Sequence, residues 1–156
     1  MHNKSLNQPP VSVIVPAYNV GPYIDQCLRS LKSQSLQSIQ IIVVDDGSTD
    51  DTPERIQALQ NGEGPSIEVV RQENAGLSAA RNAGMALATG QYIGFVDADD
   101  WVSPRMFEKL YCKAVETDSE VVVCAGLKRW PDGGRKRIRL RIPAEQFGSS
   151  ASCNPE

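Results

Sequence analysis

Histidine is almost absent from this chain of 156 residues, whose only copy is His2. A Ser-His-Asp or Cys-His mechanism uses a histidine as general base, so we expect neither. The sequence also lacks a G-x-x-x-x-G-K-[ST] phosphate loop, and no G-x-G-x-x-G motif follows its first apolar run. These absences argue against nucleotide hydrolysis of the P-loop type and against a dinucleotide dehydrogenase.

Cysteine pairs and long apolar runs are absent as well. The four cysteines, Cys27, Cys112, Cys124 and Cys153, form no C-x-x-C pair. Their spacing suits neither a zinc site nor a dense disulfide framework, so we expect free thiols in a cytoplasmic protein. No apolar run reaches the roughly 18 residues of a membrane-spanning helix, and the polar residues 1–10 carry no signal-peptide pattern.

The charge is unevenly placed along the chain, whose net charge is −3. Residues 1–127 hold 9 Lys/Arg against 16 Asp/Glu, a balance of −7, and residues 128–156 hold 7 against 3, a balance of +4. A general nucleic-acid binder is expected to be basic, so we predict no nucleic-acid partner. An acidic body with a basic end suits a cation-dependent site combined with contact to an anionic surface.

Apolar runs rich in β-branched residues alternate with helical patterns. We expect strands at 11–15, 39–44, 67–71, 92–96 and 120–125, and helices from Pro22 and at 52–60, 77–89 and 104–116. Pro16 is expected to end the first strand. This alternation predicts an α/β fold, a mostly parallel sheet with helices on both faces. We assign 1–10 to a disordered N-terminus, 11–127 to one domain, and 128–156 to a basic hairpin, turning at 130–134 between 121–128 and 136–142, with a loose end.

Polar side chains follow four of these expected strands. They are Pro16, Tyr18 and Asn19 after the first, Asp45 and Asp46 after the second, Glu73 and Asn74 after the third, and Asp97, Asp99 and Asp100 after the fourth. The carboxyl ends of parallel strands meet at one edge of a sheet, where ligands of such folds bind. This placement is the first indication of a binding site.

Asp97, Asp99 and Asp100 lie within four residues of one another. Three carboxylates so close repel each other unless a cation joins them. Mg²⁺ and Mn²⁺ prefer oxygen ligands, often one or two carboxylates plus substrate phosphates. The alternative is that Asp99 or Asp100 caps the helix expected from Pro104.

Asp45, Asp46 and Arg81 each allow a binding and a structural interpretation. The two aspartates can accept hydrogen bonds from a base or sugar, or they can serve the turn chemistry of an Asp-Gly sequence. Arg81 lies near the start of an Ala-rich helix whose small residues allow close packing. Its guanidinium can meet a diphosphate or form an ion pair with one of the acidic loops.

Four motifs occur in a fixed order, each after its expected strand: VIVPAYN at 13–19, VVDDGSTD at 43–50, NAG at 74–76 with ARN at 80–82, and FVDADD at 95–100. Together they closely resemble the family 2 glycosyltransferases, over roughly residues 11–125. The resemblance implies a GT-A (Rossmann-like) fold. It also implies transfer of a sugar, with inversion, from a nucleotide-diphosphate donor, usually a UDP-sugar, to a glycan or lipid-linked acceptor at the cell envelope.

The resemblance also implies residue roles. Pro16, Tyr18 and Asp46 would line the base pocket, with Asp45 beside it, and Asn19 and Asn74 would belong to the donor-binding loops. Asp97 would contact the ribose or donor sugar, and Arg81 would face the donor. Asp99 would hold Mg²⁺ or Mn²⁺ against the diphosphate. The family's general base is a carboxylate well downstream of its D-x-D motif. The downstream acids, Asp118, Glu120, Asp132, Glu145 and Glu156, lie in no matching motif. We therefore name no catalytic base and expect a chain truncated at its acceptor half.

Two other functions remain open. One is a nucleotide-sugar-binding module without turnover, and the other is a nucleotidyltransferase, which usually has a Gly-rich basic loop after its first strand that residues 16–19 do not supply. The basic end is also ambiguous. Its charges, Lys128, Arg129, Arg135, Lys136, Arg137, Arg139 and Arg141, form either a solvated hairpin or a contact with anionic lipid at the inner face of the plasma membrane.

Overall fold

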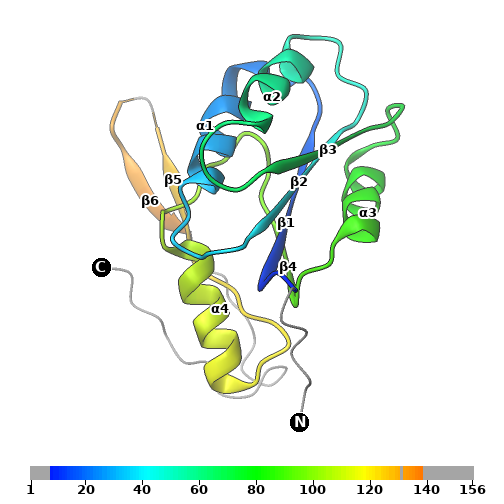
Figure 1. Cartoon of the computed structure of the whole chain (residues 1–156). Helices are drawn as coiled ribbons and strands as arrows, with labels where there is room; N and C mark the ends of the chain where they lie inside the picture. Colours follow the sequence, from blue (N-terminus) through cyan, green and yellow to red (C-terminus); the bar gives the residue numbers. More distant parts are fainter. Residues whose placement is uncertain (1–7, 131, 139–156) are drawn as a thin grey trace. The chain divides into compact units, whose positions relative to one another are not determined.

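The computed structural model describes residues 8–130 and 132–138, which fall into two compact units, one up to residue 112 and one from residue 113 onward. The first unit contains β1 (Val11–Ala17), α1 (Gly21–Lys32), β2 (Gln40–Asp45), α2 (Thr52–Gln60), β3 (Ile67–Arg71), α3 (Leu77–Leu87) and β4 (Tyr92–Phe95) (Figure 1). α4 (Met106–Thr117) crosses the division between the units. β5 (Gly126–Arg129) and β6 (Arg135–Ile138) belong to the second unit.

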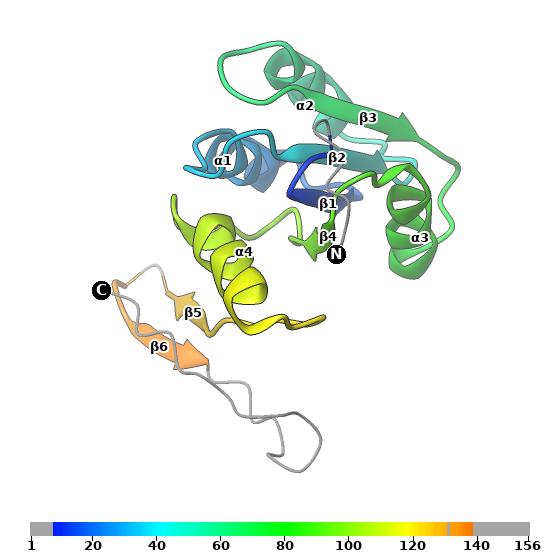
Figure 2. The same ribbon diagram turned by 60° about the horizontal axis from the view of Figure 1, so that its bottom comes forward.

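The strands of the first unit form one sheet in the order β3-β2-β1-β4, with every neighbouring pair parallel. Parallel neighbours need a crossover connection, and the intervening helices supply it. Figure 2 shows α3 on one face of this sheet and α1 with α2 on the other. The predicted parallel sheet with helices on both faces is confirmed.

Alternate residues of the central strands build a separate core on each face. Val13 and Val43 pack in the larger core with side chains of α1, whereas Ile42 and Val44 pack against Ala80 of α3. At Gly84 of α3, an added Cβ would lie 2.5 Å from Ile14 Cγ2. The small residues of this helix therefore allow its close approach to the sheet, as the sequence predicts.

The prediction that Pro16 ends the first strand is wrong, because β1 continues through Pro16 to Ala17. The Ile14 carbonyl accepts a hydrogen bond from the amide of Val96 at 3.1 Å, so the backbone groups of Ile14 face β4 and, two residues later, those of position 16 face the same side. β4 ends at Phe95, so no neighbour requires an N–H from Pro16.

The predicted fifth strand, residues 120–125, is also wrong. This segment has no regular structure, and Val121 and Val123 are 65% and 49% exposed. Its β-branched residues favour a strand, but a strand also needs a neighbour for its N–H and C=O groups. No described residue pairs with it, and the antiparallel pair β5–β6 begins only at Gly126.

The predicted hairpin is confirmed, although its first strand begins at Gly126 and not at residue 121. The Trp130 amide closes its turn by donating to the Gly134 carbonyl at 3.0 Å. Within the described residues, no helix is long and apolar enough to cross a membrane. Pro9 and Pro10 accept backbone hydrogen bonds from Gln91 and Tyr92. The prediction of disorder is therefore wrong for Pro9 and Pro10. Residues 1–7, residues 139–142 of the hairpin and the loose C-terminal end lie outside the described residues.

Candidate functional site

The loops after β1 and β2 are joined through Asn19. Its backbone is in the left-handed region, at φ 51°, which asparagine tolerates better than most residues. Its amide donates to Ser48 Oγ at 3.0 Å, and its Oδ1 accepts from the amide of Thr49 at 2.8 Å. The structure therefore gives Asn19 a loop-joining role that the sequence analysis did not foresee.

Asp46 is only 2% exposed, and its carboxylate accepts three hydrogen bonds from the loop that leads into α3. Oδ1 accepts from Gln72 Nε2 at 2.7 Å and from the amide of Ala75 at 2.9 Å, and Oδ2 accepts from the amide of Gly76 at 2.8 Å. Burial acts to raise the pKa of Asp46, but these hydrogen bonds outweigh it and hold the pKa below its ordinary value.

Asp45 is equally buried and lies against Arg71, its partner in the β2–β3 register. Its Oδ1 accepts from the amide of Ser48 at 2.9 Å, and its Oδ2 is 3.3 Å from Arg71 Nε. Oδ2 of Asp45 and Nε of Arg71 are thus close enough for an ion pair, but they are not aligned for a hydrogen bond. Arg71 also donates to the Ser48 carbonyl at 3.1 Å. The sequence analysis missed Arg71. Its position at the end of the third expected strand, beside the end of the second, could have indicated that it lies near Asp45.

The predicted donor-binding residues Pro16, Tyr18 and Asn74 differ in exposure. Tyr18 is 48% exposed and Asn74 is exposed, so both side chains are accessible to a ligand. Pro16 is buried within β1. Pro16 is therefore part of the sheet itself, near the carboxyl end of β1, whereas the aromatic ring of Tyr18 is exposed to solvent.

The three aspartates after β4 lie in an exposed turn, which the Asp100 amide closes by donating to the Asp97 carbonyl at 2.9 Å. Partial burial, followed by the charges of Asp99 and Asp97, raises the pKa of Asp100. α4 begins at Met106, too far along the chain for Asp99 or Asp100 to be its N-cap residue. The capping alternative is therefore wrong.

These carboxylates do not form a complete metal site by themselves. Among the residues that the structure describes, no three His, Cys, Asp or Glu side chains converge as metal ligands. The exposed oxygens nevertheless suit a hard cation that also takes ligands from a substrate, because Mg²⁺ often uses one or two carboxylates plus phosphate oxygens. The donor set therefore fits such an ion only together with a phosphate ligand.

Arg81 pairs with Asp97, with 2.8 Å between Nη2 and Oδ1, and its guanidinium lies 5.8 Å from the centre of the Phe95 ring. The ion-pair interpretation of Arg81 is thereby confirmed. Its Nε is buried and has no hydrogen-bond partner among the described residues. The contact between Arg81 and a diphosphate stays a prediction.

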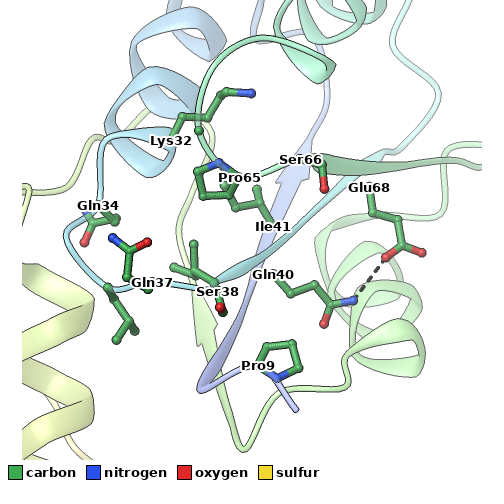
Figure 3. A pocket seen from close by; sticks show the side chains of 13 residues that line it. Pro9, Lys32, Gln34, Gln37, Ser38, Gln40, Ile41, Pro65, Ser66 and Glu68 are labelled. Atoms are coloured by element: carbon green, nitrogen blue, oxygen red, sulfur yellow. Dashed lines mark hydrogen bonds between the residues drawn. The ribbon is translucent and has the colours of Figure 1, made fainter. Parts of the chain in front are cut away.

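A pocket of about 650 Å³ lies at the opposite, amino-terminal edge of β2 and β3, lined by residues such as Gln40, Ser66 and Glu68 (Figure 3). A smaller one of about 220 Å³ lies between α2 and β3 and includes Asp45 and Arg71. Neither is lined by Tyr18 or the acidic turn. Tyr18, Asn74 and the acidic turn are exposed at the carboxyl ends of the strands and lie outside both pockets, whereas Pro16, Asp45 and Asp46 are buried beside them. These carboxyl ends are the candidate site.

Comparison with known proteins identifies the family of this chain. A model of glycosyl transferase family 2 matches residues 12–152. The chain is 44% identical to EpsJ, an uncharacterized glycosyltransferase of Bacillus subtilis (strain 168), over 95% of this chain and 41% of EpsJ. It thus spans about two fifths of that relative's length.

Two solved structures share the fold. TarS of S. aureus in complex with UDP-GlcNAc has a TM-score of 0.66 at 26% identity, covering 89% of this chain and 38% of TarS. The mannosyltransferase PcManGT of Pyrobaculum calidifontis, in complex with GDP-Man and Mn²⁺, has a TM-score of 0.56 at 32% identity, covering 60% of this chain and 28% of that protein. With its GT-A sheet and these matches, the chain belongs to glycosyltransferase family 2.

Proposed function

We propose that this chain is the donor-binding part of a glycosyltransferase that uses a nucleotide-diphosphate sugar, with a UDP-sugar preferred. The observation that carries the proposal is the gathering of the Tyr18 ring, the Asp46-anchored loop and the acidic turn at one edge of a sheet similar to that of TarS, which was solved with UDP-GlcNAc. A nucleotide needs an aromatic face, hydrogen-bonding groups for base and sugar, and compensation of the diphosphate charge.

Each predicted residue has a role in this proposal. Tyr18 stacks on or flanks the uracil, with Pro16, Asp45 and Asp46 shaping the base pocket and Asn19 and Asn74 in the adjoining loops. Asp97 contacts the ribose or donor sugar, and its partner Arg81, 2.8 Å away, faces the diphosphate. The Arg81 side chain is 35% exposed, so its guanidinium can meet a phosphate oxygen beside its bond to Asp97.

Asp99 is proposed to hold Mg²⁺ or Mn²⁺ together with the diphosphate. Such an ion, when bound, stabilises the negative charge that develops on the leaving nucleotide. The chain's own contribution is to present exposed carboxylate oxygens in a tight turn after β4. PcManGT, a structural relative, was solved with Mn²⁺.

Transfer with inversion requires a general base on the face of the sugar opposite the leaving group, and we assign that role to no residue. The second candidate function is therefore nucleotide-sugar binding without turnover. Loss of a general base typically lowers a rate by about 10²–10⁴-fold, so UDP binding with very slow sugar transfer by this chain would favour the binding-only candidate.

A panel of UDP- and GDP-sugars, with Mn²⁺ or EDTA, tests both candidates. Calorimetry should detect binding of UDP-sugars, and nucleotide release with an added glycan or lipid-linked acceptor should be slow. Absence of binding to every nucleotide would contradict the proposed function. Rapid multiple turnover would contradict the binding-only alternative.

We also propose peripheral contact of the β5–β6 hairpin with anionic lipid at the cytoplasmic face of the membrane. Its register sets Lys128 opposite Lys136 and Arg129 opposite Arg135, and like charges in such positions destabilise a hairpin. Leu127 is exposed beside these cations, a combination that suits an interfacial surface.

Flotation with vesicles tests this contact. The chain should float with anionic vesicles at low salt, and Lys136→Glu should weaken this binding, since each basic residue near such a surface contributes about 1 kcal/mol. Equal behaviour with neutral and anionic vesicles would leave only the solvated hairpin.

A further inference from the structure

The segment from the acidic turn to the start of α4, residues 97–107, has little regular structure of its own. Within it, the Asp100 amide donates to the Asp97 carbonyl and the Met106 amide donates to the Ser103 carbonyl. Local bonds of this kind shape two turns, but they do not attach the segment to the sheet. Its position must come from contacts with other elements.

Gln34, just beyond the end of α1, makes the central contacts. It is 7% exposed, and its Nε2 donates to the Ser103 carbonyl at 2.7 Å while its Oε1 accepts from the amide of Phe107 at 3.2 Å. The same Nε2 donates to the carbonyl of Ser30 at 3.1 Å, which ties the side chain to α1. One amide side chain therefore joins α1 to two points of the segment.

Two further residues of α1 continue this contact toward the aspartates. Ser30 Oγ accepts from the amide of Val102 at 3.1 Å. The Sγ of Cys27, a fully buried residue, lies 3.8 Å from the Asp97 carbonyl. Burial, together with the nearby aspartates, raises the pKa of Cys27 to about 12, so the thiol keeps the proton that it donates. All of these bonds reach the backbone, so none of them occupies the carboxylate of Asp99 or that of Asp97, which pairs with Arg81.

We propose that Gln34, assisted by Ser30, is a positioning residue that sets the acidic turn for a cation shared with the donor diphosphate. Mutual repulsion among the three carboxylates tends to spread the turn. Cys27 contacts the backbone at the start of the turn, and Ser30 and Gln34 hold the backbone that follows it. Support of this kind typically changes metal affinity by about 10–100-fold. The inference rests on the proposed function, because it concerns the same donor site.

Gln34→Leu is the direct test, with Gln40→Leu as the matched control. Gln40 is also a networked glutamine, bonded to Ser12 and Thr89 at the opposite edge of the sheet. Calorimetry measures UDP affinity with Mn²⁺ and with EDTA, and the ratio of the two is the readout. In Gln34→Leu the ratio should fall about 10-fold with little change in EDTA, whereas Gln40→Leu should keep the wild-type ratio. Equal ratios in both variants would overturn the proposal.

Hydrogen exchange provides a readout that needs neither metal nor nucleotide. Amides of residues 97–107 should exchange faster in Gln34→Leu, while those of β1 and β2 remain protected. Should Gln34→Leu not fold, Ser30→Ala removes the single bond to Val102 and should raise exchange in the same segment. Unchanged exchange there would overturn the positioning role. Wild-type UDP affinity that ignores Mn²⁺ would instead contradict the proposed metal site, and hydrogen exchange would still decide the role of Gln34.

Discussion

Two acidic clusters follow β2 and β4, two strands on either side of β1 in the same sheet, and their side chains differ in burial and in hydrogen bonding. Asp45 and Asp46 after β2 are buried and accept hydrogen bonds from surrounding loops, whereas Asp97, Asp99 and Asp100 after β4 are exposed. The carboxylates of the first cluster bind the protein's own loops and so stabilise the fold. In the second cluster Asp97 pairs with Arg81, and the exposed Asp99 is the residue that we propose for a cation.

The pKa directions express the same contrast. Internal hydrogen bonds hold the pKa of Asp46 below its ordinary value in spite of burial. Burial and the neighbouring charges raise the pKa of Asp100. A carboxylate already satisfied by the protein stabilises the fold, while a carboxylate repelled by its neighbours is stabilised by an added cation.

Asp46→Ala should have the largest effect on stability. It leaves the amides of Ala75 and Gly76 and the Gln72 side chain without their acceptor, so we expect a loss of about 3 kcal/mol in the free energy of unfolding. Urea unfolding measures it. UDP binding should weaken by about 1–3 kcal/mol. Unfolding curves equal to wild type would contradict the structural role of this carboxylate.

Asp99→Asn should act on metal-dependent binding instead. The ratio of UDP affinities with Mn²⁺ and with EDTA should fall by about 10-fold or more, since the variant removes the proposed ligand. Stability should remain within about 0.5 kcal/mol of wild type, because Asp99 is exposed. A ratio unchanged from wild type would exclude Asp99 as the metal ligand.

The pH dependence of stability should reveal Asp46 separately. Because its folded pKa is depressed, its contribution is present above the unfolded pKa of about 3.9 and is lost as the pH falls through the folded value. Wild-type stability should therefore fall more steeply with acid than that of Asp46→Asn. If wild type and Asp46→Asn lost stability equally below about pH 4, the depressed pKa of Asp46 would be contradicted.

Asp100→Asn should have the smallest effect, in the opposite direction. A raised folded pKa means that ionisation of Asp100 costs stability as the pH rises, so removing the charge should increase stability at neutral pH by up to about 0.5 kcal/mol. Thermal unfolding without metal measures the change. A decrease in melting temperature would show that this carboxylate has a stabilising partner.

The edge that carries the site could be predicted from sequence, while the partners of its residues could not. Alternation of β-branched runs and helical patterns is local information, and it predicted β3 and α2 with the observed bounds. Whether Asp46 would bind a ligand or a loop depended on amides of residues 75 and 76, which approach it only after α3 packs on the sheet.

The sequence by itself determined the parallel α/β arrangement and placed four polar loops at the carboxyl ends of the strands. Both follow from the local periodicity of apolar residues and from the alternation of strands with helices. Only the tertiary structure decided that residues 120–125 are not a strand, that β1 passes through Pro16, and that Gln34 binds the segment following the acidic turn. Strand pairing and side-chain hydrogen bonds need partners distant in the chain. Their presence follows from packing, which local patterns do not contain.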